Sequence, residues 1–339
     1  MTARPSARPL EAVGPGPLHI DAAAEVERIC GALRSQLSET LKRRGLVLGM
    51  SGGEDSSVCA ALAERAVGPK RVFALFMPER DSDPASLELA SAWASELGID
   101  SAVEDVTALL EGAGCYRRRD EAIRRVVPEF GEGLGCKLVL PGSRTESDLL
   151  NVTSLAVQPP GGELRVVRLP AAEYRQIVAA TNFKQRTRKM MEYYHADRLH
   201  YAVIGTPNRL EYDQGFFVKG GDGLADVKPI AHLYKTQVYQ LAAYLGVPAA
   251  VTSRPPTTDT FSLPQSQEEF YFSLPAAMMD RALHAHNAGL PADDAARQLG
   301  LEAEQVQRAY RDIDQKRATT RYLHLGPQLV EPVAELALD

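Results

Sequence analysis

The sequence has few cysteines, a single tryptophan and no excess of basic residues. Cys30, Cys59, Cys115 and Cys136 show no C-x-x-C spacing and lie far from any histidine pair. That arrangement argues against a disulfide framework and a structural zinc site, and it favours a reduced intracellular protein. The 38 Lys and Arg residues against 44 Asp and Glu give a formal net charge of -6, which argues against a nucleic acid partner.

Long apolar runs are also absent. No stretch approaches the roughly 20 apolar residues needed to cross a bilayer, so we expect no membrane partner. The N-terminal sequence MTARPSARPLEAVGPGPLH lacks the apolar region of a signal peptide and is rich in proline. We therefore expect residues 1–20 to be a flexible leader and the protein to be cytoplasmic.

The sequence does contain a repeated alternation of apolar runs and amphipathic stretches. With 339 residues, of which 45% are hydrophobic, the chain can bury a core as one large or two small domains. The predicted strands cover residues 46–50, 71–77, 100–106 and 201–206, and the predicted helices cover 22–44, 56–66, 84–97, 182–198 and 235–245. This alternation indicates an α/β fold: a Rossmann-like, doubly wound parallel sheet with helices on both faces.

Two regions depart from the alternation. Residues 107–170 contain short β-like runs around a Pro-Pro-Gly-Gly turn, which predicts a β-hairpin inserted into the α/β domain. Residues 266–339 read as helical, with a break near residues 290–294. We therefore expect an α/β domain over residues 21–265, interrupted by the insertion, and a helical C-terminal region packed on that domain.

A loop rich in glycine and serine joins the first predicted strand to the next helix, where open α/β sheets bind ligands. Its sequence is Ser51-Gly52-Gly53-Glu54-Asp55-Ser56-Ser57. Glycines allow close approach of the backbone and a helix N-terminus favours anions, so the loop suits a pyrophosphate. It lacks the lysine of a Walker loop, and Asp55 suits Mg²⁺ better than phosphate. A tight turn followed by a helix cap is the alternative explanation.

The loop resembles that of the N-type ATP pyrophosphatases, in the adenine nucleotide alpha-hydrolase superfamily, which cleave ATP between its α and β phosphates. Further along, several segments follow the order typical of ammonia-dependent NAD synthetases: residues 181–188, 203–211, 215–226, 229–237 and 256–259. Residues 215–226, for example, read GFFVKGGDGLAD. Several motifs in one order are more specific than a single loop. The chain thus resembles a divergent NAD synthetase with an insertion.

The resemblance implies a role for each matching position. The implied ATP-binding residues are Gly49, Ser51, Gly52, Gly53, Asp55, Ser56, Ser57, Lys235 and Thr257. The implied residues for the dinucleotide substrate are Asn182, Arg186, Thr206, Glu211, Lys219, Asp222 and Asp226. Asp55, Glu211 and Lys235 are the implied catalytic residues, with Asp55 and Glu211 as ligands of Mg²⁺. Arg188, by contrast, is expected to be a surface charge on its helix.

The implied reaction is a ligation in two steps. A carboxylate of nicotinic acid adenine dinucleotide attacks the α-phosphorus of ATP–Mg²⁺, and ammonia then displaces AMP to give NAD. The implied small-molecule partners are the dinucleotide, ATP and ammonia. The resemblance also implies a homodimer, with free ammonia as the source of nitrogen or a separate amidotransferase that delivers it.

Some positions depart from the family pattern and leave alternatives open. Glu54 stands where such loops usually carry an apolar or neutral residue, and Gln267 and Gln315 stand where the family has Asp and His. Gln267 and Gln315 affect mainly the acceptor half, so an amide-forming ligase for a different carboxylate is the nearest alternative, whereas Glu54 affects the phosphate loop. A non-catalytic nucleotide binder is a more distant one. So is a DNA-binding regulator, since residues 295–310 show helix-turn-helix spacing.

Overall fold

A parallel sheet forms the centre of the fold. The computed structural model describes residues 16–139, 153–254, 260–264, 271–272 and 274–333. The sheet has the strand order β3-β2-β1-β7. Its strands are β1 (Leu46–Gly49), β2 (Val72–Phe76), β3 (Asp100–Val103) and β7 (Ala202–Val203). Each lies within a segment that the sequence predicted to be a strand.

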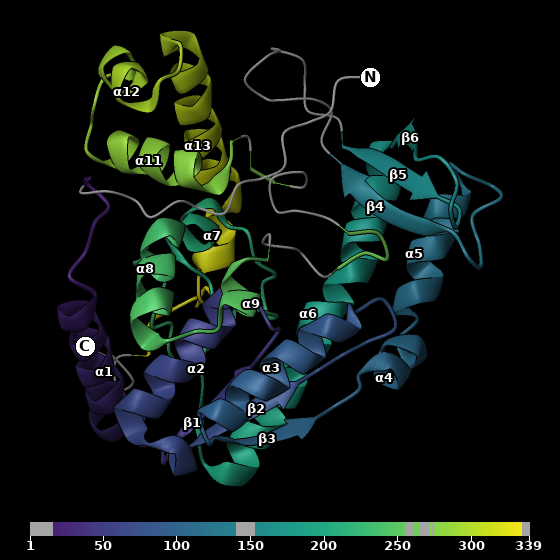
Figure 1. Ribbon diagram of the computed structural model, residues 1–339. Coiled ribbons are helices and arrows are strands. Elements are labelled where there is room, and N and C mark those ends of the chain that lie inside the picture. The colour runs from purple at the N-terminus through teal and green to yellow at the C-terminus, as the bar shows by residue number, and fades with distance from the viewer. Residues whose placement is uncertain (1–15, 140–152, 255–259, 265–270, 273, 334–339) are drawn as a thin grey trace.

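Helices cover both faces of this sheet (Figure 1). Leu46 and Leu48 of β1 pack in one core, whereas Val47, which points the opposite way, packs in another. The helices of the first core are α1 (Ala22–Ser35), α2 (Glu54–Val67), α3 (Pro84–Glu96) and α8 (Lys235–Leu245). Those of the second are α4 (Thr107–Gly112), α5 (Cys115–Arg124) and α6 (Ala171–Leu199). The predicted doubly wound fold is therefore confirmed.

The end of the predicted leader is part of the fold. Leu18 is buried, its carbonyl accepts a hydrogen bond from Gln240 Nε2 over 2.9 Å, and Ile20 N donates to Gln240 Oε1 over 3.1 Å. Residues 1–15 lie outside the described residues. Three short elements complete this part of the chain: η1 (Gln36–Thr40), η2 (Pro69–Arg71) and α9 (Ala249–Thr252).

The predicted insertion, residues 107–170, begins with α4 and α5, which pack on the parallel sheet, and continues with a small antiparallel sheet (Figure 1). Its strands, in spatial order, are β4 (Gly135–Val139), β5 (Ser154–Gln158) and β6 (Arg165–Arg168). β5 and β6 make the hairpin predicted around the Pro-Pro-Gly-Gly turn, and β4 adds a third strand that the prediction of a hairpin did not include. Leu138 and Leu155 of this sheet pack against Ile177 of α6, so the insertion is fixed to the α/β domain.

α6 is 29 residues long and runs from the insertion to the parallel sheet (Figure 1). It begins at Ala171, well before the predicted start at residue 182. Pro170 is its N-cap residue, and the missing N–H of proline costs no helical hydrogen bond at that position. The helix therefore spans both the insertion and the segment that resembles the family motif.

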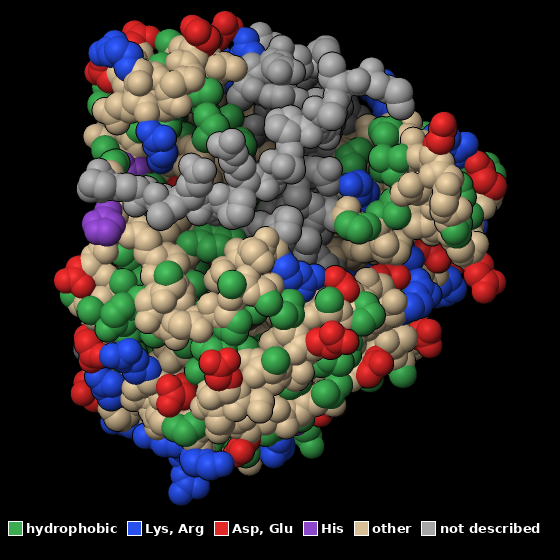
Figure 2. Space-filling view, in the orientation of Figure 1, with side chains coloured by type: hydrophobic (Ala, Val, Ile, Leu, Met, Phe, Trp, Pro, Cys, Tyr) green, Lys and Arg blue, Asp and Glu red, His purple; other side chains and the backbone are tan. Residues whose placement is uncertain are grey.

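The C-terminal region is helical, as predicted. Its helices are α11 (Ala276–Asn287), α12 (Ala292–Leu299) and α13 (Ala303–His324), and α7 (Arg209–Gln214) lies beneath them. Leu210, Met279 and Ile313 share one core, which attaches these helices to the α/β domain. Charged side chains of both signs are interspersed over the described part of the face in Figure 2. Within the described residues, no helix has the length and apolarity that crossing a membrane requires.

Candidate active site

A cavity of about 1010 Å³ lies at the carboxyl ends of β1, β2 and β7. Its walls are the β1–α2 loop, the β2–α3 loop, α6, the residues that follow β7, and the end of α13. The carboxyl edge of an open parallel sheet is the usual place for a ligand, because the strand-to-helix loops converge there. The cavity is therefore the candidate active site.

The β1–α2 loop, here called the phosphate loop (residues 50–55), depends on a glycine. Gly52 has a φ of +77°, and a Cβ there would lie 2.4 Å from the carbonyl oxygen of Ser86 in α3. Gly53 is the N-cap of α2, and the hydroxyls of Ser56 and Ser57 donate to its carbonyl over 3.0 and 2.9 Å. The N-terminus of α2 borders the cavity, so its unpaired N–H groups can bind a phosphate.

The structure brings most of the predicted ATP-binding residues to this cavity. Those that line it are Gly49, Ser51, Gly52, Gly53, Asp55 and Ser56. Ser57 is fully buried below the loop and shapes it without lining the cavity. Lys235 is also buried, with 2% of its surface exposed, and it contacts the loop through carboxylates. Thr257 lies outside the described residues.

Lys235, the first residue of α8, forms ion pairs with both Glu54 and Asp55. Burial raises the pKa of Asp55, Lys235 opposes this, and Glu54 adds to it, giving a value of about 6. For Lys235, burial alone would lower the pKa, but Asp55, Glu54 and Glu211 raise it well above its ordinary value. Lys235 is therefore a fixed cation beneath a loop that carries more negative than positive charge.

Asn208 and Glu211 bring a further acid to this place. Asn208 is the N-cap of α7, and it forms a capping box with Glu211. Its Nδ2 donates to Glu211 Oε2 over 3.0 Å and to the carboxylate oxygens of Asp55 over 3.4 and 3.5 Å. The predicted metal ligands Asp55 and Glu211 thus meet at one amide group. Sequence reasoning missed Asn208, although an Asn three residues before a Glu is the spacing of a capping box.

These residues fit a divalent cation. Among the described residues there is no group of three or more His, Cys, Asp or Glu side chains that could hold a metal ion. Mg²⁺ does not need one, because one or two carboxylates together with phosphate oxygens are its usual ligands. Asp55 and Glu211 supply two hard oxygen donors, and Asn208 Nδ2 donates to both carboxylates. The donor set therefore matches magnesium bound to a nucleotide.

Most of the residues predicted to bind the dinucleotide line the same cavity: Asn182, Arg186, Thr206, Glu211, Lys219 and Asp222. Arg186 Nε donates to the carbonyl of Lys219 over 3.2 Å. Lys219 Nζ in turn donates to the carbonyls of Tyr322 and Leu325 over 2.7 and 2.8 Å. The end of α13 therefore helps to position Lys219, which is predicted to bind the substrate.

The two predicted aspartates of this set differ in their placement. Asp222 lines the cavity, accepts a hydrogen bond from Val218 N over 2.7 Å, and has a pKa that burial raises. Asp226 does not line the cavity. Its carboxylate accepts hydrogen bonds from Val203 N over 2.7 Å and from the Tyr193 hydroxyl over 3.2 Å. Asp226 therefore fixes its loop to β7.

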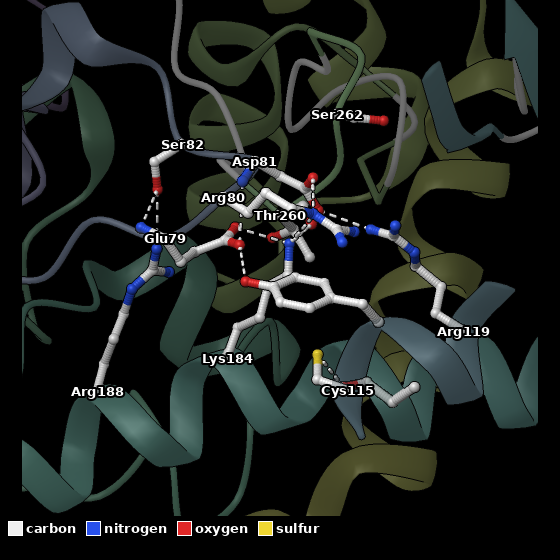
Figure 3. A network of polar contacts seen from close by, with 12 residues as sticks. Glu79, Arg80, Asp81, Ser82, Cys115, Arg119, Lys184, Arg188, Thr260 and Ser262 are labelled. Carbon is white, nitrogen blue, oxygen red and sulfur yellow. Dashed lines mark hydrogen bonds and ion pairs between the residues drawn. The ribbon is translucent and has the colours of Figure 1, made fainter. Parts of the chain in front are cut away.

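Two basic residues of α6 make contacts that the sequence did not reveal (Figure 3). Arg188, expected on the surface, lines the cavity; its guanidinium donates to the carbonyl of Met77 over 3.1 Å and to Ser82 Oγ over 3.4 Å. That expectation was wrong because the β2–α3 loop folds over this face of α6. Lys184, which sequence reasoning did not single out, is buried and ion-paired with Glu79 and Asp81.

The sequence matches proteins of known family. The model of the NAD synthase family matches residues 25–121 and 162–322. An NH(3)-dependent NAD(+) synthetase of Rhizobium meliloti is 59% identical over 319 residues, which cover 94% of this chain and 95% of that protein. One from Thermotoga maritima is 36% identical over 72% of this chain and 81% of its own length. The family match omits most of the insertion, whereas the rhizobial match covers so much of the chain that it extends into it.

Solved structures agree with the fold. An NMN synthetase from Francisella tularensis superimposes with a TM-score of 0.62 at 20% identity, covering 92% of this chain and 100% of that chain. At that identity, the likeness concerns the fold alone. An NAD+ synthetase from Burkholderia pseudomallei has a TM-score of 0.53 at 26% identity, with 88% and 91% of the two chains covered. On the match of the family model over most of its length, and on its relatives, the chain belongs to the NAD synthase family.

Proposed function

We propose that the chain amidates the carboxylate of nicotinic acid adenine dinucleotide with ammonia, using ATP, and that it releases NAD, AMP and pyrophosphate. Its relatives from Rhizobium meliloti and Thermotoga maritima are NH(3)-dependent NAD(+) synthetases. The observation that carries the proposal is the meeting of the phosphate loop, Asp55 and Glu211 in one cavity with Asn182 and Arg186 of α6. ATP and the acceptor must bind in the same cavity, because the carboxylate of one attacks a phosphorus of the other.

The size of the cavity supports two substrates. Small-molecule sites usually enclose roughly 300 to 1000 Å³, and this cavity has about 1010 Å³. The phosphate loop forms one wall, and the predicted dinucleotide residues form another. A reaction between an ATP phosphorus and a substrate carboxylate requires both molecules to be held in contact, and this arrangement permits it.

The chemistry proceeds through an acyl-adenylate. A carboxylate oxygen bonds to the α-phosphorus, the bond to the bridging oxygen breaks, and pyrophosphate leaves with the electron pair. Ammonia then attacks the carbonyl carbon and loses a proton. The bond between that carbon and the phosphate oxygen breaks, and AMP leaves with the electron pair. No enzyme nucleophile is needed, so the protein acts by positioning the reactants and stabilising charge.

The residues in and around the phosphate loop have separate tasks in this proposal. The N-terminus of α2 binds phosphate oxygens through backbone N–H groups. Lys235, held below the loop by Glu54, provides a positive charge next to the phosphates. Asp55 and Glu211 would hold Mg²⁺, and the cation would neutralise charge on the phosphates. Asn208 keeps the two carboxylates side by side.

On the acceptor side, α6 and the loop after β7 provide the recognition groups. Arg186 and Lys219 are suited to phosphate or carboxylate groups, and Asn182 and Asp222 are suited to hydroxyl and amide groups. All four side chains come from residues that line the cavity. Gln267 and Gln315 depart from the family pattern in the acceptor half. The alternative of a different carboxylate is therefore tested with an acid that lacks the adenylyl group.

The remaining expectations concern the setting of the enzyme. We infer a cytoplasmic homodimer that uses free ammonia. Light scattering after gel filtration measures the mass in solution, and a mass near 36.9 kDa would identify a monomer instead. Turnover with ammonium chloride alone would show that a separate amidotransferase is not required. No turnover with ammonium, but turnover with an added glutaminase, would favour such a partner.

The decisive experiment measures pyrophosphate release from ATP–Mg²⁺ with ammonium and nicotinic acid adenine dinucleotide. We expect NAD as product, loss of activity in Asp55→Ala, and full activity in Asp293→Ala, whose side chain is exposed on α12. The same assay is run with nicotinic acid mononucleotide. Faster turnover with the mononucleotide would replace the proposed acceptor, and no release with any acid would support a nucleotide binder without catalytic activity.

A further inference from the structure

A buried ionic cluster lies directly beside the cavity (Figure 3). At its centre is Lys184 of α6, of which 1% is exposed. Its ammonium donates to Glu79 over 2.7 Å, to Asp81 over 2.8 Å and to the carbonyl of Thr260 over 2.7 Å. A lysine ammonium has three hydrogens, so these contacts use its full donor capacity. Lys184 does not line the cavity, and it can act on a substrate only through its partners.

Helix α5 holds the partners of Lys184. From α5, the guanidinium of Arg119 donates to Asp81 over 2.7 Å, and the hydroxyl of Tyr116 donates to Glu79 over 2.7 Å. The acids are therefore fixed from both sides. We call these five residues, Lys184, Glu79, Asp81, Arg119 and Tyr116, the Lys184 cluster.

The insertion also fixes the segment that contains Thr260. In β4, Cys136 N donates to Ser262 Oγ over 2.9 Å, and Leu263 N donates to the carbonyl of Cys136 over 3.2 Å. Residues 260–264 thus lie along the free edge of β4. β4 is part of the residues that the family match omits, so this support is an addition to the matched family domain.

The cluster is connected to the phosphate end of the cavity. Glu79 and Asp81 belong to the β2–α3 loop. The start of α3, which follows this loop, packs against the phosphate loop so closely that the Ser86 carbonyl leaves no room for a Cβ at Gly52. Arg254 joins the same place, since its guanidinium donates to Asp83 over 2.7 Å and to Ser86 over 3.4 Å.

We propose that Lys184 is a positioning residue for ATP, and that Tyr116 and Arg119 of α5 keep it and its acids in place. Lys184 joins the β2–α3 loop to Thr260, and β4 of the insertion supports the segment that contains Thr260. The Lys184 cluster therefore acts on the ATP end of the cavity rather than on the acceptor acid. This inference rests on the proposed function.

The test compares two arginines of the same helix. Arg119→Met removes a cluster member, whereas Arg117→Met removes an exposed arginine of α5 that pairs with Glu121 on the surface. We expect Arg119→Met to raise the KM for ATP about tenfold, with kcat and the KM for the acceptor acid changed less than about threefold. Tyr116→Phe, which keeps the ring, should shift the KM for ATP in the same direction by a smaller factor. Arg117→Met should match the wild type.

A second measurement keeps the test valid if Arg119→Met is poorly folded. The rise in melting temperature on adding ATP–Mg²⁺ without acceptor is recorded for Tyr116→Phe, Arg117→Met and the wild type. A smaller rise in Tyr116→Phe alone supports the proposal. Lower melting temperatures with an unchanged KM for ATP, or equal increases in both KM values, would overturn it. If ATP–Mg²⁺ raises the melting temperature of the wild type but no turnover is seen, only the proposed reaction is contradicted. If ATP–Mg²⁺ does not raise it, both the proposed reaction and the role of Lys184 are overturned.

Discussion

Two buried lysines of this protein stand in similar surroundings and differ in charge balance. Lys235 meets Glu54 and Asp55, which follow β1, and Lys184 meets Glu79 and Asp81, which follow the neighbouring strand β2. Both lysines are almost fully buried. In each cluster, a single ammonium therefore faces two carboxylates at the carboxyl edge of the same sheet.

The partners of the acids are different. Arg119 brings a second cation to Asp81, and although burial raises the pKa of that carboxyl, Lys184 and Arg119 outweigh burial and lower it to about 2. Asp55 has Glu54 beside it and shares Asn208 with Glu211, and its pKa is about 6. In the Lys184 cluster, Lys184 and Arg119 balance the two carboxylates. The Lys235 cluster has an excess of negative charge, which suits the binding of a cation between its carboxylates and the phosphates of a nucleotide.

The two clusters can be compared by changing one aspartate of each to asparagine. The largest effect on activity is expected from Asp55→Asn. Because the folded pKa of about 6 lies above the ordinary value of 3.8, ionised Asp55 destabilises the fold at pH 7. Without Mg²⁺, the melting temperature of Asp55→Asn should equal or exceed that of the wild type. Pyrophosphate release should fall by about 100-fold or more, because a ligand of the cation is lost. A variant that melts lower and stays active would contradict both expectations.

Asp81→Asn should have the opposite effect on stability. Its folded pKa of about 2 lies below the ordinary value of 3.8, so ionised Asp81 stabilises the fold above about pH 4, and this contribution is lost as the pH falls toward 2. Urea unfolding at pH 7 should show a loss of roughly 2 kcal/mol. The difference between variant and wild type should shrink when unfolding is repeated at decreasing pH. A difference that does not depend on pH would mean that lost packing, rather than lost charge, explains it.

Removal of one predicted metal ligand should have a smaller effect on the enzyme than removal of Asp55. Glu211→Gln keeps the shape of the capping side chain and removes its charge. We expect the Mg²⁺ concentration for half-maximal activity to rise about tenfold, while EDTA abolishes activity in both proteins. Glu88→Gln, an exposed residue of α3, is the matched control. An unchanged requirement for Mg²⁺ in Glu211→Gln would remove Glu211 from the proposed metal site.

The smallest effect is expected from Glu54→Gln. The amide can still accept a hydrogen bond from Lys235, and Asp55 still pairs with that lysine. Activity should stay within about threefold of the wild type, and stability should not fall, since one charge of an acidic cluster has been removed. Melting temperature and kcat are measured together. A large loss of kcat would show that Glu54 has a direct role in the reaction.

The sequence predicted those parts of the fold that depend on local pattern. The apolar runs at residues 46–50 and 71–77 contain β1 and β2, and α8 begins and ends at the predicted residues 235 and 245. Tight loops with glycine and a helix N-terminus are also local, so the phosphate loop could be recognised. The capping box of Asn208 and Glu211 was equally visible in the spacing, although it was not used.

Other features depend on contacts between distant segments, and the sequence could not reveal them. A lysine on an amphipathic helix is expected in solvent, and Lys184 is buried only because Glu79, Asp81 and Thr260 come to it from elsewhere in the chain. Arg188 was misjudged for the same reason, since its partners lie in the β2–α3 loop. The role of the insertion follows from the edge of β4, which no periodicity shows.

The contacts of Lys184 also determine when the cavity can form during synthesis. The partners of its ammonium are 105, 103 and 76 positions away along the chain. Glu79 and Asp81 leave the ribosome first, Lys184 much later, and Thr260 later still. The parallel sheet can begin to assemble from strands that are already available, but the ATP end waits for long-range contacts. A nascent chain that stops before residue 260 therefore cannot complete its nucleotide site, however well its sheet is formed.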